Sequence, residues 1–236
     1  LFTILPFEKE WFNNRGVKNI VAIKHPLLVH YEDYLEKLPP KLYPKEKINL
    51  LILPGSRDSE VERLLPIFLE AAKEISKLYD VKLALVKTTS VSDKYYNSVS
   101  DDFSQVYESE DLKYALGEAH LCIAASGTVT LNCALFQVPT IVCYQLSLFN
   151  EFMVQNIMKY KWFISLANIV HNELIFPEYV QGNVKANVIV NKVISWLEDE
   201  SVYNNIVKKL SKTKSLLTGD PVDLVGFMGN VITDNE

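Results

Sequence analysis

Ile48-Asn49-Leu50-Leu51-Ile52-Leu53-Pro54-Gly55-Ser56-Arg57 joins an apolar run to a small polar turn, and this combination indicates the fold class of the chain. Its apolar first half, Ile48–Leu53, is typical of a strand buried on both faces, and a small turn containing Gly55 follows at once. Apolar residues at helical spacing come next, with Ser59 and Glu62 in the pattern of a capping box. A short turn between a parallel strand and a helix leaves backbone N–H groups unpaired at a positive dipole end. The sequence therefore predicts a phosphate site here.

A second turn of the same kind, Ala125-Ser126-Gly127-Thr128, follows the apolar residues 121–124. Ser126 and Thr128 bring two hydroxyls and Gly127 brings a flexible backbone, although plain capping of the next helix by Ser126 is an alternative. Two phosphate-type turns in one α/β domain indicate a nucleotide diphosphate ligand. Arg57 supplies the fixed charge that such a ligand favours.

Strands alternate with helices from residue 48 onwards, which predicts a Rossmann-like parallel sheet with flanking helices and right-handed crossovers. In such a sheet the ligand lies beyond the carboxyl ends of the strands, where both turns are expected. A helical C-terminal tail should follow the sheet. The expected strands are 48–53, 81–86, 121–124 and 140–144, and the expected tail helices are 184–197, 202–216 and a last one after Pro221.

The region before residue 48 has a different composition. Short strands are expected at 1–5 and 19–23, with a short helix at 8–15 between them, and residues 31–47 have the prolines and charges of a linker. Leu1 falls inside an apparent strand, so we expect the chain to be the back portion of a longer protein. Three parts are predicted: residues 1–47 end a preceding domain and form a linker, 48–182 bind the nucleotide, and 183–236 pack on the preceding domain or on a partner subunit.

Composition excludes several classes of function. A net charge of -5 and a pI near 5.5 argue against nucleic acid as a partner. The three cysteines lie in apolar stretches without CxxC spacing, which indicates a reducing, cytoplasmic compartment. The four histidines show no metal-ligand spacing, so neither a metal nor another cofactor is expected. Apolar runs are far below membrane-spanning length, which predicts a soluble or at most peripheral protein.

Two residues in the helices behind the turns are weaker candidates for the site. Glu60 is as well explained as an acid favoured by the dipole in a first helical turn as it is by a contact with the nucleotide. Asn132 lies about one turn into the second helix. One interpretation is that its side chain reaches the same cleft, and the other is that it is a partly buried polar residue that binds no ligand.

The remaining candidates lie outside the two turns. Glu178 and Gln181 fall in Pro177-Glu178-Tyr179-Val180-Gln181-Gly182, where a carboxylate at a helix start suits a ribose diol, although a surface acid beside a proline is commonly just a first-turn acid. His25 is either a polar contact in a cleft between domains or the end of a strand before Pro26. Trp162 and residues 149–157 are expected in a core or an interface. Further possible cleft residues are Tyr144 and Asn168.

Six stretches taken together resemble one family, the lipid-A-disaccharide synthases of bacterial outer-membrane lipid A assembly. They occur in the order and spacing of that family over nearly the whole chain, which corresponds to roughly the C-terminal two-thirds of its usual length. The stretches are Leu5-Pro6-Phe7-Glu8, His25-Pro26-Leu27, Leu53-Pro54-Gly55-Ser56-Arg57 with Glu60, Ala125-Ser126-Gly127-Thr128, Val138-Pro139 leading to Tyr144, and Pro177-Glu178 with Gln181.

The resemblance implies a glycosyltransferase of the GT-B type, with two Rossmann-like halves and a cleft between them. This chain would hold the C-terminal half, which binds the UDP-sugar donor. The implied reaction transfers 2,3-diacylglucosamine from UDP-2,3-diacylglucosamine to 2,3-diacylglucosamine 1-phosphate with inversion, releasing UDP. It needs no metal and takes place at the cytoplasmic face of the inner membrane, where the enzyme is peripheral.

The resemblance also implies limits for this chain by itself. The catalytic base of the family belongs to the N-terminal acceptor domain, so no residue here is assigned that role and we expect the isolated chain to be inactive. Helix N-termini and an arginine would stabilise the charge of the leaving UDP in place of a metal.

Two positions depart from the pattern of the family. Lys24 stands where a glycine is usual before the His-Pro pair, and Asn132 stands where a glutamate is usual. A diverged member or a shifted donor preference would account for both departures.

Three other readings compete with this family. A sugar-nucleotide epimerase shares the two-domain plan but shows a Ser-Gly-Gly turn followed by paired glutamates, whereas this chain has no acid between Thr128 and Glu151. The peptidoglycan-precursor glycosyltransferase has glycine-rich signature turns that are missing here. A non-catalytic UDP-binding module also describes a chain with half of the cleft.

The apolar content of the tail predicts an oligomer. Residues 184–197 carry more apolar surface than one face of a small sheet needs, and 202–216 and 222–231 add further apolar faces. We therefore expect a homodimer whose contact includes residues beyond about Asn183.

Overall fold

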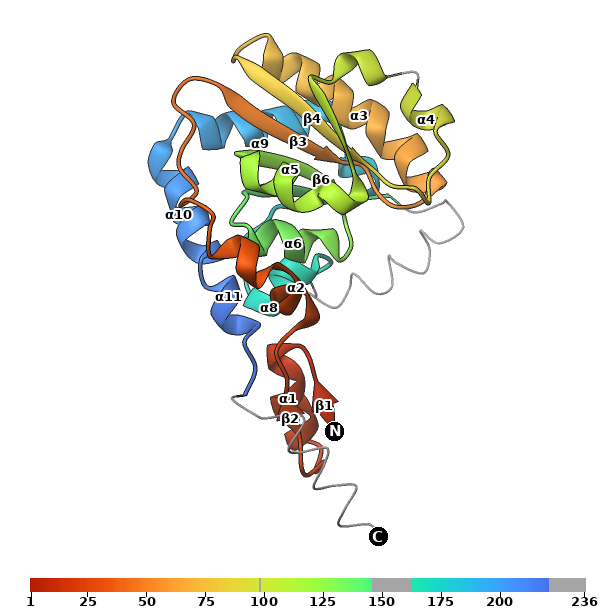
Figure 1. The fold of residues 1–236 in the computed structure, drawn as a ribbon. Coiled ribbons are helices and arrows are strands. Elements are labelled where there is room, and N and C mark those ends of the chain that lie inside the picture. The colour runs from red at the N-terminus through yellow and green to blue at the C-terminus, as the bar shows by residue number, and fades with distance from the viewer. Residues whose placement is uncertain (98, 146–162, 221–236) are drawn as a thin grey trace.

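The computed structural model describes residues 1–97, 99–145 and 163–220, and a six-stranded parallel sheet forms its centre (Figure 1). The strand order is β5-β4-β3-β6-β7-β8, which is the doubly wound arrangement of dinucleotide-binding domains. The predicted Rossmann-like sheet is confirmed. The strands are β3 (Ile48–Leu53), β4 (Val81–Lys87), β5 (Gln105–Glu108), β6 (Leu121–Ala125), β7 (Thr140–Tyr144) and β8 (Glu178–Val180).

The strand order reverses between β3 and β6, which lie side by side at the middle of the sheet. Leu50 pairs with Leu121 and Leu53 pairs with Ala124, so the two strands end at the same level. Each strand is followed by one of the two predicted turns. The register of this single pair therefore brings turns that are some 70 residues apart in sequence to one edge of the sheet.

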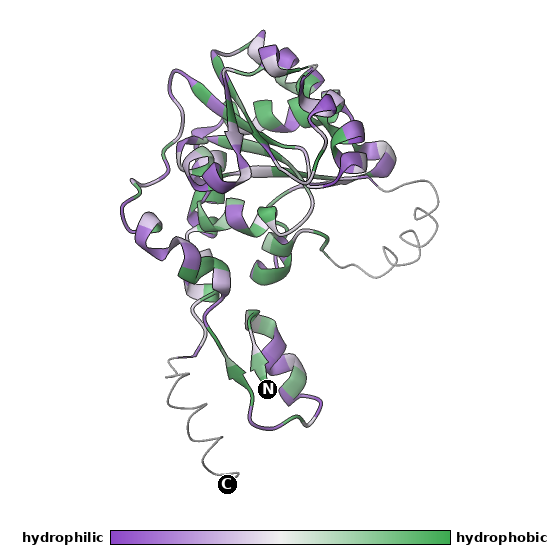
Figure 2. Cartoon of the chain, turned by 45° about the vertical axis from the view of Figure 1, so that its right-hand side comes forward, coloured by the Kyte–Doolittle hydropathy of each residue, from purple (hydrophilic) through white to green (hydrophobic). Residues whose placement is uncertain are grey.

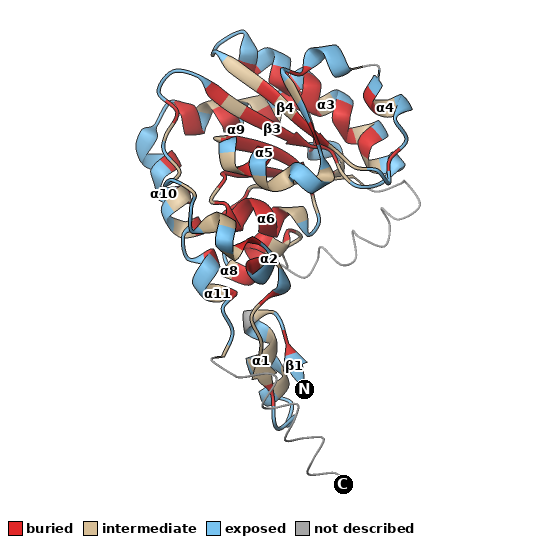
Figure 3. Cartoon of the chain, in the orientation of Figure 1, coloured by how far each residue is buried: buried red, intermediate tan, exposed pale blue. Residues whose placement is uncertain are grey.

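Helices cover both faces of the sheet. Figure 1 shows α3 and α9 on one side and α5 and α6 on the other, as right-handed crossovers require. The centre of the sheet is buried between these layers (Figure 3), and every residue of β6 is buried. The bounds are α3 (Asp58–Ser76), α4 (Lys94–Asn97), α5 (Leu112–Glu118), α6 (Val129–Leu135), α8 (Leu166–His171), α9 (Ala186–Leu197), α10 (Glu200–Leu210) and α11 (Thr213–Leu216), with short 3₁₀ turns at Ser100–Asp102, Ser109–Asp111 and Gln181–Asn183.

Three local expectations are wrong. Ser59 does not cap α3, because the helix already begins at Asp58 with Arg57 in the N-cap position. Part of the expected linker is the helix α2 (Pro26–Leu35), which forms because its Leu28 and Tyr31 are buried in the core. Glu178 starts the edge strand β8 rather than a helix, because this segment completes the parallel ladder beside β7.

The C-terminal helices pack on the domain that contains the six-stranded sheet. Ile189 and Trp196 of α9, Tyr203 of α10 and Leu217 after α11 belong to the same buried core as the sheet. α9 lies against α3, which offers a second apolar side beyond the one that faces the sheet. The expectation that this tail packs only on a preceding domain or a partner is wrong for residues 186–217, and the argument for a dimer loses that support. The helix expected after Pro221 lies outside the described residues.

A half-buried lysine, Lys41, helps to hold the linker against the domain. The ammonium of Lys41 donates to the carbonyl oxygens of Leu116, Gly117 and Ala119 at 3.1, 2.9 and 2.8 Å. These carbonyls end α5 and have no further helical N–H to bind, so the lysine supplies the donors that the helix end lacks. The linker therefore runs along the domain in a defined path.

The N-terminal residues form a small βαβ unit that projects from the rest of the molecule (Figure 1). It consists of β1 (Phe2–Thr3), α1 (Pro6–Asn13) and β2 (Val21–Ala22), and the two strands pair in parallel. Figure 2 shows hydrophobic residues on this unit, far from the sheet. Leu1, Phe2, Ile4, Phe7 and Trp11 are among its exposed apolar side chains.

Two segments connect this unit to the domain: the first follows β2, and the second follows α11. Hydrogen bonds join the two segments to each other. The His25 N–H donates to the Leu217 carbonyl at 2.9 Å, and the Asp220 N–H donates to the Ala22 carbonyl at 2.7 Å. The Asp220 carboxylate accepts from the Ala22 N–H and from the Lys9 ammonium. The C-terminal segment thus returns to the N-terminal unit.

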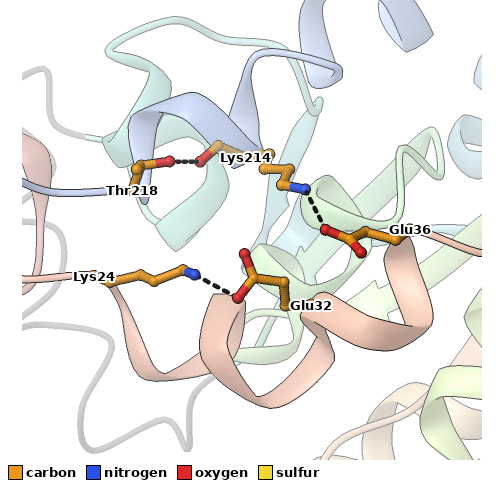
Figure 4. A network of polar contacts seen from close by, with 5 residues as sticks. All are labelled: Lys24, Glu32, Glu36, Lys214 and Thr218. Atoms are coloured by element: carbon orange, nitrogen blue, oxygen red, sulfur yellow. Dashed lines mark hydrogen bonds and ion pairs between the residues drawn. The ribbon is translucent and has the colours of Figure 1, made fainter. Parts of the chain in front are cut away.

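Lys24, one of the departures from the family pattern, lies on the first of these two segments. Its ammonium pairs with Glu32 of α2, and the same close-up shows Lys214 paired with Glu36 and Thr218 donating to the Lys214 carbonyl (Figure 4). The bond and the charge of Lys24 lower the pKa of the Glu32 carboxyl. Lys24 is therefore used in a local ion pair near the point where the two segments meet.

Replacing Gly219 by alanine should loosen this junction. Gly219 has a φ of +72°, and a Cβ built on it would lie 2.5 Å from the Ile23 carbonyl carbon. We expect Gly219→Ala to cost about 1–3 kcal/mol of local stability and to speed amide exchange at Ala22 and His25. Gly182→Ala is the matched control, because a Cβ there meets no atom within 4 Å. Unchanged exchange at both amides in Gly219→Ala would contradict the expectation.

Candidate functional site

A cavity of about 320 Å³ opens at the carboxyl ends of the central strands and contains both predicted turns. It lies at the point where the strand order reverses, which is where doubly wound sheets bind ligands. Seven predicted site residues are brought together there, although they come from two distant parts of the sequence. The lining residues are Leu53, Gly55, Ser56, Arg57, Glu60, Val86, Thr88, Ser109, Leu112, Ala125, Ser126, Gly127, Thr128 and Val129.

The first turn is shaped around Glu60. Gly55 has a φ of +125°, and a Cβ built on it would lie 2.6 Å from the Glu60 carboxylate oxygen Oε2, so only glycine fits. The same oxygen accepts the Ser56 N–H at 3.0 Å, and Oε1 accepts from Arg57 Nη1 at 2.8 Å. The Arg57 side chain is 76% exposed and the Glu60 side chain only 17%. The turn therefore presents a positive side chain to the cavity from a rigid base.

The loop after β4 supports this turn, and the sequence analysis did not assign it to the site. The Ser90 hydroxyl donates to the Ser56 carbonyl, and the Ser92 N–H donates to the Asp58 carboxylate, both at 2.9 Å. Thr88 and Ser109 line the cavity itself. All of these follow the carboxyl ends of β4 and β5, so the rule that located the two turns would also have pointed to them.

The second turn has an open backbone. Gly127 has a φ of +156°, and a Cβ there would meet no atom within 4 Å. Its carbonyl accepts from the Thr130 hydroxyl at 2.8 Å, while the Ser126 N–H donates to the Cys143 carbonyl of β7. Thr128 rather than Ser126 occupies the N-cap position of α6. The alternative that Ser126 simply caps this helix is therefore wrong.

Glu178 and Asn168 form a polar network apart from the cavity lining. Glu178 Oε1 accepts the Ser165 N–H and the Asn168 side-chain amide, both at 2.8 Å, and Oε2 accepts the Ile164 N–H at 2.9 Å. Asn168 is fully buried, and its Oδ1 accepts the N–H groups of Ile175 and Phe176. These two side chains therefore fix the start of α8 against β8. Oε2 of Glu178 keeps capacity for a further donor.

Four other candidates also lie outside the cavity lining. His25 is buried and caps α2, with its Nδ1 accepting the Leu27 N–H at 3.1 Å. Asn132 is buried within α6, and its Oδ1 has no partner among the described residues. Tyr144 is half-buried at the end of β7, and Gln181 follows β8 in a left-handed conformation with a φ of +51°. Trp162 and residues 149–157 lie outside the described residues.

The chemistry available at the site is that of binding and charge stabilisation. Cys122, Cys133 and Cys143 are buried, and burial raises the pKa of the Cys143 thiol to about 12, so it is not a nucleophile at neutral pH. Within residues 1–97, 99–145 and 163–220, no group of three or more His, Cys, Asp or Glu side chains is placed to hold a metal ion. In the same part of the chain, no helix has both the length and the apolar character needed to span a bilayer.

Comparison with known proteins gives a consistent result. A family model described as lipid-A-disaccharide synthetase matches residues 1–219. The lipid-A-disaccharide synthase of Rickettsia prowazekii is 32% identical over 218 residues, which cover 88% of this chain and 56% of that protein. The enzyme of the same name from Colwellia psychrerythraea is 30% identical over 220 residues, covering 87% and 54%. The chain thus spans about half the length of the curated relatives it matches.

Similarity to solved structures extends to the fold alone. A putative UDP-N-acetylglucosamine 2-epimerase from Listeria monocytogenes superposes with a TM-score of 0.56 at 13% sequence identity. The superposition covers 88% of this chain and 53% of that one.

Removing the Glu178 carboxylate should destabilise the domain. Glu178→Ala leaves two backbone N–H groups without their acceptor and removes one of the two acceptors of the Asn168 amide, whose other acceptor is the Phe176 carbonyl. Each unpaired buried group costs about 1–3 kcal/mol. We expect a clear loss in the free energy of unfolding by urea. Glu173→Ala is the control, because that exposed acid makes only a surface ion pair with Lys209. Equal stability of Glu178→Ala and the wild type would contradict this assignment.

Acid should destabilise the protein through His25. Burial lowers the pKa of His25 below its ordinary value of 6.5, against a weaker opposing effect of Glu8. The unfolded state therefore binds the proton first, so the contribution of His25 is complete above about pH 6.5 and is lost as the pH falls through the lower folded pKa. His25→Asn keeps a capping side chain that does not titrate. Between about pH 7.5 and 5 the stability of the wild type should fall faster than that of His25→Asn, and parallel curves would refute this.

Proposed function

Because the chain belongs to the lipid-A-disaccharide synthetase family, we propose that it supplies the UDP-binding half of an inverting glycosyltransferase of lipid A synthesis. The proposed donor is UDP-2,3-diacylglucosamine and the proposed acceptor is 2,3-diacylglucosamine 1-phosphate. The products are the disaccharide 1-phosphate and UDP. The observation that supports this most directly is the meeting of both phosphate-type turns with Arg57 in one cavity.

In the proposed complex the diphosphate lies between the two turns. Gly55 and Gly127 let the backbone approach the phosphates, and the hydroxyls of Ser56, Ser126 and Thr128 are available as donors. The Arg57 guanidinium and the start of the long helix α3 face the negative charge that grows on UDP as the bond to the sugar breaks. Oε2 of Glu178 and the side chain of Gln181 are proposed for the ribose end of the nucleotide.

The proposal assigns no catalytic base to this chain. A base must reach the hydroxyl of the acceptor. Among the described residues, the one carboxylate of the cavity lining is Glu60, which lies at the turn proposed for the diphosphate and binds Ser56 and Arg57 there. We place the base, the acceptor and the peripheral contact with the cytoplasmic face of the inner membrane in the part of the relatives that this chain does not span.

Arg57→Ala should weaken the binding of the diphosphate part of UDP and leave the binding of the nucleoside part unchanged. A charge-assisted hydrogen bond contributes about 1.5–3 kcal/mol, so UDP should bind roughly 10- to 150-fold more weakly while uridine binding changes little. Isothermal calorimetry with UDP and uridine measures both. Arg63→Ala, which removes the same charge from α3 outside the cavity lining, should retain UDP binding. Absence of UDP binding by the wild type at millimolar concentration would refute the proposed function.

A further inference from the structure

The Glu60 carboxylate lines the cavity, and each of its two oxygens accepts a hydrogen bond from the first turn. Oε2 accepts the Ser56 N–H at 3.0 Å and Oε1 accepts from Arg57 Nη1 at 2.8 Å. We infer that Glu60 is a positioning residue, which fixes the first turn and aims Arg57 at the diphosphate without contacting the nucleotide itself. This inference rests on the proposed function and assigns to Glu60 a role different from direct binding.

The backbone of the turn is held from two sides. Glu60 binds the N–H of Ser56, and the Ser90 hydroxyl binds the carbonyl of the same residue at 2.9 Å. Gly55 packs directly under the Glu60 side chain, because a Cβ at position 55 would lie 2.7 Å from Glu60 Cβ. The shape of the turn and the position of the carboxylate therefore depend on each other.

The bond to Glu60 restricts the conformations of the Arg57 side chain. Its side chain is 76% exposed and would sample many rotamers if it were free. The bond to Glu60 holds it through Nη1, while the rest of the guanidinium fork has donors left for a phosphate. Immobilising such a side chain before the ligand arrives removes part of the entropic cost of binding.

Charge repulsion between Glu60 and the diphosphate predicts the opposite effect on binding when Glu60 is removed. A carboxylate close to a diphosphate repels it, so removing that charge should tighten binding if Glu60 did nothing else. Positioning predicts that removing it weakens binding, because Arg57 and the Ser56 peptide lose their fixed geometry. The sign of one measured change therefore separates the two interpretations.

The test is calorimetry of the chain with UDP, pyrophosphate and uridine. Glu60→Ala should bind UDP and pyrophosphate about three- to tenfold more weakly and leave uridine binding unchanged. Glu60→Gln keeps an acceptor and the packing on Gly55, and it should recover part of the loss. In the Arg57→Ala background Glu60→Ala should cost less than in the wild type, because only its bond to the Ser56 peptide is then lost. Glu62→Ala is the matched control, an exposed acid of the same helix outside the cavity lining.

Two results would overturn the inference while leaving the proposed function intact. One is that Glu60→Ala binds pyrophosphate as tightly as the wild type or Glu62→Ala, or more tightly. The other is an equal loss with and without Arg57. Melting curves accompany every variant, and Glu60→Gln carries the test if Glu60→Ala does not fold. A wild-type chain that binds neither UDP nor pyrophosphate would overturn the proposed function and this inference with it.

Discussion

The parallel pairing of β3 with β6 is the constraint on which the rest of this structure depends. Both strands are buried, and their register sets Leu53 beside Ala124, immediately before the two turns. A slip of one residue would turn every side chain of a strand to the opposite face, so the apolar packing on both faces fixes the register. Since the strand order reverses between these two strands, no crossover helix covers their ends. The cavity is a consequence of that topology.

Carboxylates that bind backbone N–H groups recur at the points where this fold makes its turns. Glu60 does so in the first turn, Glu178 at the start of α8 and Glu8 at the start of α1, where its Oε2 accepts the N–H groups of Ile4 and Leu5. A helix start leaves N–H groups without helical partners, and a nearby carboxylate satisfies them with a charge-assisted bond. In this chain an acid near a helix start thus serves first to shape the backbone, and any contact with a ligand is additional.

The C-terminal tail connects the sheet domain to the N-terminal βαβ unit. α9 to α11 complete the apolar packing around α3 and α6, and residues 217–220 then return to β2. The connection consists of two antiparallel segments, residues 22–25 and 217–220. Backbone hydrogen bonds and the Asp220 carboxylate link the two segments. The projecting unit keeps exposed apolar side chains, whereas Ile189, Trp196 and Tyr203 of the tail helices are buried in the core of the domain.

Four of the six strands, their parallel arrangement and the two turns could be predicted from the sequence, because buried strands, glycine turns and helical spacing are local patterns that survive in the fold. The short strands β5 and β8 could not be predicted in this way. The sequence by itself also determined that Arg57 and Ser126 to Thr128 would meet, since the carboxyl ends of parallel strands share one edge. It placed Glu60 in the right helix but Glu178 at a helix start instead of in a strand, and it identified the partners of neither. Those partners come from Ser56 within the turn and, for Glu178, from residues 164–168, and local spacing does not reveal which donors lack acceptors. The tertiary structure alone decided that α2 would form in an apparent linker, that residues 178–180 would become an edge strand and that the tail would pack on its own domain. In each case the burial of apolar surface against distant residues outweighed the local signal.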